Sequence, residues 1–241
     1  MRFISLRIAS LAAMLAFQPV QPEAFAWHDK THLTIAEAAG FDLWYSAVAP
    51  DVAKSKSEFS AVESPNHYFN NNANRAVTPA MVLEQAGSYN LPGEGEGEGH
   101  LYGAVIGSVR AFRAMKASGK YARYPLVFCA HYIGDLSMPL HNTPYDDFNK
   151  TRHSINDGTV ESSVRNNIGY IQRNMTPITI NSESDLAREV AAVAESARQL
   201  GLKMRKENRN MTVDEAYIQV IRSASLLRAV LAYADNEPSG K

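Results

Sequence analysis

The sequence predicts an all-α protein built as a single compact multi-helix domain. Apolar residues recur at helical spacing in several long segments, and residues that cap or start helices stand at their ends. No two alternating apolar–polar segments are joined by a hairpin turn, which argues against a sheet. With 241 residues, of which 45% are hydrophobic, the chain is long enough to bury a core and too apolar to be disordered.

The first 26 residues are expected to be a secretory signal peptide rather than part of the domain. A positive start is followed by an uncharged apolar run over residues 8–17 and by a small-x-small tripeptide that ends at Ala26. The run is too short to span a membrane. We therefore expect cleavage after Ala26, a mature domain over residues 27–241, and a periplasmic or secreted location. A buried N-terminal helix is the alternative.

Four segments of the mature domain carry the helical pattern: residues 101–115, 125–140, 186–200 and 213–231. Residues 125–140 are apolar on nearly every side, which predicts a buried central helix with Pro125 in its first turn and Pro139 at its end. Thr212 and Glu215 have the spacing of a capping box, so they predict the start of the last helix.

Loops are expected over residues 70–74, which are rich in Asn, and over residues 93–99, where Gly and Glu alternate. Residues 235–241 are expected to be a frayed tail. No internal repeat or linker marks a second domain. No other apolar segment is long enough to cross a bilayer.

Composition restricts the chemistry. A formal net charge of −1 argues against a broad electrostatic surface for nucleic acid. One cysteine rules out an internal disulfide framework and a cysteine-based zinc finger. Cys129 is expected to be a small buried residue on another helix face than His131. Any metal would therefore be held mainly by carboxylates and by some of the seven histidines.

Five of these residues cluster in one short stretch. His131 and Asp135 are four apart in the central helix, and this spacing places both side chains on one face. His141 follows that helix, and His153 and Asp157, again four apart, open another predicted helix. An unpaired carboxylate in an apolar helix is costly to bury, and a metal ion would satisfy it. His with carboxylate suits zinc, although each residue alone has an ordinary alternative as a core His or a local ion pair.

The segment from His131 to His141, HYIGDLSMPLH, resembles the signature of the zinc-dependent phospholipases C. That superfamily also contains the zinc-dependent single-strand nucleases of fungal and plant type. The resemblance extends from Trp27 to about Asp157, and it implies the superfamily's multi-helix fold with a metal cleft.

The resemblance also implies three zinc ions and their ligands. The first would take Asp51, His67, His131 and Asp135. The second would take His141, His153 and Asp157. The third would take the α-amino nitrogen and carbonyl oxygen of Trp27, His32 and a bridging Asp135. The implied reaction is phosphodiester hydrolysis by a zinc-activated water, which Asp51 would orient or deprotonate as the catalytic residue.

The substrate class stays open between two readings of this resemblance. The 11-residue gap between His141 and His153 resembles the phospholipases, so a phospholipid headgroup is the expected substrate and peripheral membrane contact is expected. Asp157, where phospholipases have Glu, resembles the nucleases and makes single-stranded nucleic acid the alternative. Tyr68, Phe69 and Tyr145 are candidates to line a headgroup or stack a base, with ordinary packing as the alternative. A non-catalytic zinc-binding helical protein is a further alternative.

Overall fold

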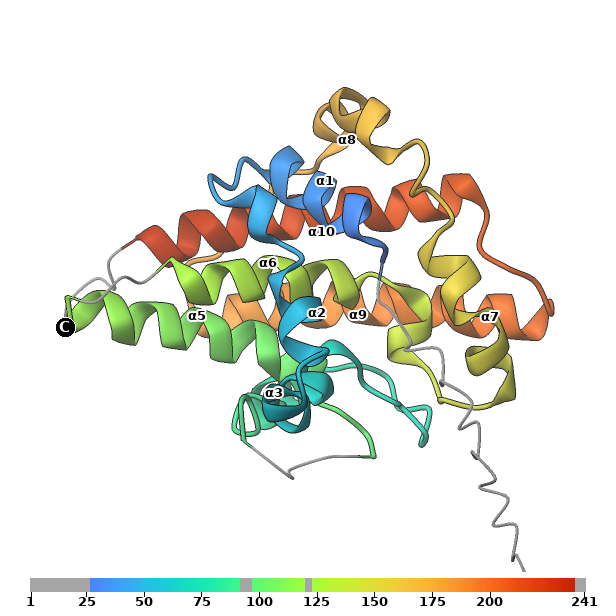
Figure 1. Cartoon of the computed structure of the whole chain (residues 1–241), viewed down its shortest axis with the longest axis horizontal. Coiled ribbons are helices and arrows are strands. Elements are labelled where there is room, and N and C mark those ends of the chain that lie inside the picture. The colour runs from blue at the N-terminus through green and yellow to red at the C-terminus, as the bar shows by residue number, and fades with distance from the viewer. Residues whose placement is uncertain (1–26, 92–96, 120–122, 237–241) are drawn as a thin grey trace, which may run out of the picture.

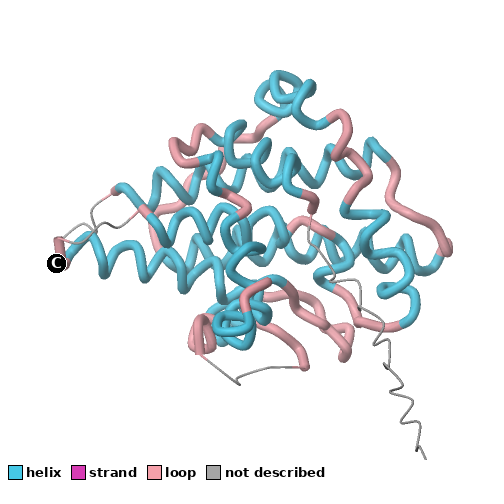
Figure 2. Tube along the Cα trace, viewed as in Figure 1, coloured by secondary structure: helices cyan, strands magenta, loops and turns pink. Residues whose placement is uncertain are grey.

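Helices supply the regular secondary structure of this computed structural model, which describes residues 27–91, 97–119 and 123–236 (Figures 1 and 2). No strand occurs in these ranges, so the predicted all-α single domain is confirmed. The expected signal peptide, most of the Gly-Glu loop and the end of the tail lie outside the described residues. None of the described helices combines the length and the apolar character needed to span a membrane.

Ten α-helices and four short 3-10 helices follow one another in the described chain. The α-helices are α1 Asp29–Ala39, α2 Ala49–Lys54, α3 Ser57–Glu63, α4 Pro79–Gln85, α5 Leu101–Ala117, α6 Tyr124–Leu136, α7 Asp147–Asp157, α8 Ile168–Asn174, α9 Glu183–Lys206 and α10 Val213–Asp235. The 3-10 helices are η1 Trp44–Ser46, η2 Ser64–His67, η3 Pro139–Asn142 and η4 Val164–Asn167.

The central helix is α6, as the sequence predicts. It packs against α5, α10, α1 and α9, and every residue from Pro125 to Leu136 is buried (Figure 1). Its end differs from the expectation, because α6 stops at Leu136 and Pro139 begins the separate turn η3. The Asn142 side chain donates to the carbonyl oxygens of Leu136 and Met138, at 3.1 and 2.8 Å, and so satisfies the helix end.

The long helices α5, α9 and α10 confirm the other predicted segments, and Thr212 and Glu215 form the predicted capping box at α10. Cys129 is buried, as predicted, 3.9 Å from the carbonyl oxygen of Val105. Residues 70–74 lie outside regular structure.

The helix that carries His153 and Asp157 has a different boundary from the predicted one. These residues form the last turn of α7 rather than its first. Asp146 caps the helix start, because its side chain accepts a hydrogen bond from the backbone N–H of Asn149 at 3.1 Å. The two ligand candidates therefore stand at the end of α7, where the chain turns towards α1.

The N-terminus of α1 is tied to this turn. The carboxylate of Glu161 accepts hydrogen bonds from the backbone N–H groups of Lys30 and Thr31, at 3.0 and 3.1 Å, and from the Thr31 hydroxyl. The Thr31 N–H also bonds the carbonyl oxygen of His28, at 2.9 Å. A carboxylate at a helix N-terminus interacts favourably with the helix dipole. Trp27, just before α1, is fully buried and its indole N–H donates to Ser137 Oγ at 3.2 Å. The Glu161 contacts hold α1 against the turn after α7, and the Trp27 contact holds it against the end of α6.

Candidate metal centre

Eight predicted side-chain ligands come together in three buried groups, each of which could hold a metal ion. The groups are His32, His131 and Asp135; Asp51, His67 and His131; and His141, His153 and Asp157. We call them the first, second and third group, in this order, which is not the order in which the three expected zinc ions are given above. In each one, the possible ligand atoms lie within 4.8 Å of one another. The ninth predicted ligand, Trp27, would act through backbone atoms.

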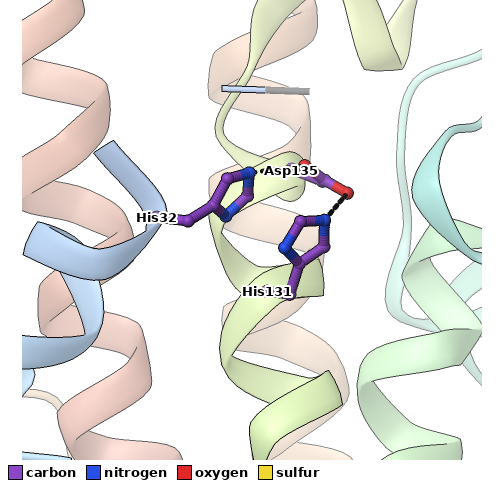
Figure 3. A group of neighbouring side chains, drawn as sticks. All are labelled: His32, His131 and Asp135. Atoms are coloured by element: carbon purple, nitrogen blue, oxygen red, sulfur yellow. Dashed lines mark ion pairs between the residues drawn. The ribbon is translucent and has the colours of Figure 1, made fainter. Parts of the chain in front are cut away.

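The first group joins α1 to α6 (Figure 3). The rings of His32 and His131 are stacked, with centroids 3.9 Å apart, and their Nε2 atoms lie 3.3 Å from the two oxygens of Asp135. The His131–Asp135 distance confirms that the four-residue spacing puts both groups on one helix face. The second group shares His131, and His67 Nδ1 lies 3.0 Å from Asp135 Oδ2 and 3.7 Å from Asp51 Oδ1. Asp135 therefore stands between the first two groups.

The third group carries the strongest evidence for a cation. His141 Nδ1 donates to the carbonyl oxygen of His67 at 2.5 Å, and His153 Nδ1 donates to Asn149 Oδ1 at 2.6 Å. The Asn149 amide is oriented by its own donation to two backbone carbonyls. Each neutral imidazole therefore carries its proton on Nδ1, the nitrogen that faces away from the other ring. Their bare Nε2 atoms face each other at 2.9 Å, an arrangement that a bound cation would stabilise.

The buried carboxylates fit the same interpretation. Asp135 and Asp157 are fully buried. The oxygens of Asp135 lie 3.0–3.3 Å from nitrogens of His32, His67 and His131. Asp157 has no hydrogen-bond partner among the described residues, and its Oδ2 lies 3.6 Å from His153 Nε2. An unpaired buried carboxylate is costly, so these oxygens and the bare imidazole nitrogens together form donor sets that suit zinc.

The pKa shifts differ between the groups. Burial lowers the pKa of His141 to about 4 and holds that of His153 well below its usual range, because desolvation disfavours the charged ring. Burial also raises the pKa of Asp157 well above its usual range. Burial opposes protonation of His131 as well, but Asp135 and Asp51 outweigh it and raise its pKa to about 9. At neutral pH the two rings of the third group are therefore neutral, whereas His131 holds a proton that a metal would displace.

The metal-free protein is expected to lose stability as the pH falls from about 6.5 to about 4. His141 and His153 bind protons less readily when folded than when unfolded, so acid favours the unfolded chain. The contribution of these two rings to stability is fully present above pH 6.5 and declines as the pH falls. The raised pKa of Asp157 acts in the opposite direction and offsets part of the loss, so the net decline corresponds to fewer than two protons. Thermal melts of chelator-treated protein across this range test the prediction. A melting temperature that stays constant from pH 6.5 to 4 would contradict it.

Gly134 is expected to be essential for the first group. A Cβ atom added there would lie 2.5 Å from His32 Nδ1, so the ring would have to move away from Asp135. Gly-to-Ala changes inside helices usually stabilise by about 1 kcal/mol. Gly134→Ala is instead expected to destabilise by about 1–3 kcal/mol and to weaken metal binding. Denaturant titration and metal analysis measure both effects. Gly103→Ala in α5, where a Cβ atom would meet the backbone of Gln85, serves as an overpacking control away from the groups. A more stable Gly134→Ala protein with full metal content would overturn the expectation.

A pocket of about 550 Å³ opens over the second and third groups. Residues from both groups line it together with polar, aromatic and aliphatic neighbours: Lys54, Ser60, Ser64, His67, Tyr68, Asn70, Gly97, Leu140, His141, Tyr145 and His153. Of the three predicted aromatic candidates, Tyr68 and Tyr145 line this pocket. Phe69 does not, because it is buried in the core against Tyr102.

Three residues of the site were not predicted from the sequence. Lys54 Nζ lies 2.6 Å from Asp51 Oδ1, Glu63 contacts the ring of His67, and Asn149 orients His153. The i,i+3 spacing of Asp51 and Lys54 and the i,i+4 spacings of the other two pairs were available signals. Such spacings are common on helices, so without the burial of these side chains they do not stand out. His28 and His100 lie outside the three groups.

Comparison with models of known protein families finds no match, and no curated protein matches the chain. The three buried groups and the pocket beside them are therefore the basis for any statement about function.

Proposed function

We propose that this chain is a secreted zinc-dependent phosphodiester hydrolase of the phospholipase C-like kind. The observation that carries the proposal is that His67, His141 and His153 belong to buried His/Asp groups and also line one open pocket. A purely structural zinc site is closed by its four ligands, so this opening favours catalysis over the non-catalytic alternative. Zinc bound there would polarise phosphoryl oxygens and lower the pKa of a bound water.

Asp51 and Lys54 supply the charges at the pocket side of the site. Burial opposes ionisation of Asp51, but His131 and Lys54 outweigh it and hold the pKa of this carboxyl well below its usual range. Asp51 is therefore a permanent anion that can serve as a ligand and orient a water. Lys54 lines the pocket and places a cationic side chain where a phosphodiester anion would enter.

The surface around the pocket supports a phospholipid as substrate. Val52 and Phe59 are 57% and 54% exposed, and they stand on α2 and α3, the helices that carry Lys54 and Ser60 of the pocket. Exposed apolar side chains beside a pocket suit peripheral contact with a lipid surface. The alternative of single-stranded nucleic acid is supported by Tyr68 and Tyr145, on which a base could stack.

Parallel assays of the zinc-loaded mature domain test this proposal. The substrates are phosphatidylcholine vesicles, single-stranded DNA and a chromogenic phosphodiester. We expect release of the phosphorylated headgroup from vesicles, and we expect Lys54→Met to reduce kcat/KM while zinc content stays the same. Cleavage of DNA with intact vesicles would instead identify a nuclease. Full zinc content without hydrolysis of any substrate would identify a non-catalytic zinc protein.

We further propose that secretion and metal loading are coupled through Trp27. Its indole is buried and the next residue, His28, donates from its backbone N–H to the carbonyl oxygen of Asp157 at 3.4 Å. Cleavage after Ala26 would free the α-amino group of Trp27 as a ligand beside His32. One alanine inserted before Trp27 is expected to remove one of three zinc ions and lower hydrolysis at least about 10-fold. Elemental analysis and the vesicle assay measure this, with an alanine added after Lys241 as the control. Three zinc ions and full activity in the first variant would contradict the coupling.

A further inference from the structure

We propose that Glu63 is a positioning residue for the metal centre, which orients the ring of His67 and strengthens it as a ligand. This inference rests on the proposed metal centre and is independent of which phosphodiester is the substrate. Glu63 is the last residue of α3 and is 5% exposed. It belongs to none of the three metal-binding groups.

The two ring nitrogens of His67 face different partners. Nε2 lies 3.2 Å from Glu63 Oε1, whereas Nδ1 lies 3.2 Å from His131 Nε2 and 3.0 Å from Asp135 Oδ2. Glu63 and Asp135 both present carboxylate oxygens, which only accept hydrogen bonds, so each nitrogen of the metal-free ring faces an acceptor. A metal that took the place of the Nδ1 proton would use the Nδ1 lone pair in the second group, and the ring proton would stay on Nε2, where Glu63 accepts it.

Glu63 differs in charge from the groups that accept hydrogen bonds from three other histidine ligands. His131, His141 and His153 donate to neutral oxygens, which are Ala47 O, His67 O and Asn149 Oδ1. His67 instead donates to a carboxylate. A carboxylate behind a ligating imidazole raises its basicity and its strength as a metal donor. The second group has Asp51 as its own carboxylate and borders Asp135, so Glu63 adds a further negative charge behind it.

A buried hydrogen-bond network holds Glu63 in place. The Tyr132 hydroxyl donates to Glu63 Oε1 at 2.7 Å, and the Asn66 amide lies 3.4 Å from Oε2. Asn66 is oriented in turn by His100, because His100 Nε2 lies 2.9 Å from Asn66 Oδ1. His100, which has no place in the metal groups, thus has a position in the network behind them. These contacts restrict the motion of the Glu63 side chain, as the positioning of a ligand requires.

Stepwise zinc affinities of Glu63→Gln test the proposal. Competition with chelators of graded strength should show one of the three binding steps weakened about 10- to 100-fold and the other two nearly unchanged. Glu195→Gln is the matched control, since it removes a carboxylate that binds Arg198 and Val77 away from the metal groups. Equal weakening of all three steps, or of none, overturns the proposal.

Nitrogen NMR of the ring of His67 provides a readout that does not depend on how the variant folds. In zinc-loaded wild-type protein, the His67 ring should bind metal through Nδ1 and carry its proton on Nε2, and the Nε2 resonance should shift in Glu63→Gln, where the hydrogen-bond acceptor is no longer charged. A wild-type ring that binds metal through Nε2 overturns the proposal without any variant. Unchanged zinc affinities in Glu63→Gln alongside normal vesicle hydrolysis refute the role of Glu63 alone, whereas three-step zinc binding without hydrolysis refutes only the proposed function.

Discussion

Asp135→Asn is expected to empty two of the three metal groups and to lower phosphodiester hydrolysis by more than about 100-fold. The carboxylate is fully buried, with one oxygen 3.3 Å from His32 Nε2 and the other 3.0 Å from His67 Nδ1. Asn keeps the shape but removes the charge, and an NH2 group that cannot ligate a metal replaces one of the two carboxylate oxygens. Outer partners of metal ligands typically contribute 10- to 100-fold, so a ligand shared between two groups should contribute more.

Elemental analysis and the vesicle assay measure this effect. Zinc should fall from three ions to one, with the remaining ion in the third group, which Asp135 does not join. Asp185→Asn is the control, because Asp185 pairs with Arg188 at the exposed start of α9 and has no contact with the metal groups. Three retained zinc ions in Asp135→Asn would show that Asp135 is not a shared ligand.

Removal of zinc is expected to destabilise the fold strongly. In the metal-free protein, the bare Nε2 atoms of His141 and His153 face each other at 2.9 Å and Asp157 is buried without a hydrogen-bond partner. A ligand that binds only the folded chain stabilises it by about 4 kcal/mol when its concentration is 1,000 times the dissociation constant. Three such sites would together contribute about 12 kcal/mol, as much as the entire stability of many domains.

Denaturant titrations with and without a chelator measure the change in the free energy of unfolding. Zinc added back should restore the original transition. Magnesium at the same concentration should not, because it prefers oxygen ligands and keeps several of its waters. An unfolding transition that the chelator leaves unchanged would mean that the three groups do not hold metal in the folded protein.

The central part of the fold could be predicted from residue patterns alone. The apolar stretch after Pro125 predicts α6 and its burial, and the Thr212–Glu215 capping box predicts the start of α10. The C-terminal end of α6 and the start of α7 could not be predicted in this way. Each depends on one polar side chain: Asn142 satisfies the end of α6, and Asp146 caps the start of α7. A helix boundary depends on such single contacts, whereas helix existence is the sum of many small preferences.

The candidate site also has a part that local sequence predicts and a part that only helix packing decides. Helical spacing alone places His131 beside Asp135 and His153 beside Asp157, because residues four apart share a helix face at a fixed distance. The rotation and crossing of the helices decide which of these pairs meet His32, Asp51 and His67, and no local pattern contains that information. The orientation of each ring likewise comes from distant partners, as in the hydrogen bonds from His131 to Ala47 and from His141 to His67.

The sequence alone therefore determined the kinds of ligand atoms, their pairing along helices and the all-α fold. The tertiary structure decided how the eight side chains divide among three groups, that two of the groups border a pocket, and that Lys54, Glu63 and Asn149 support them. The physical reason is burial. The same His, Asp or Glu is an ordinary solvated group at the surface, and it becomes a strong metal ligand or a positioning group where water is excluded and few partners remain.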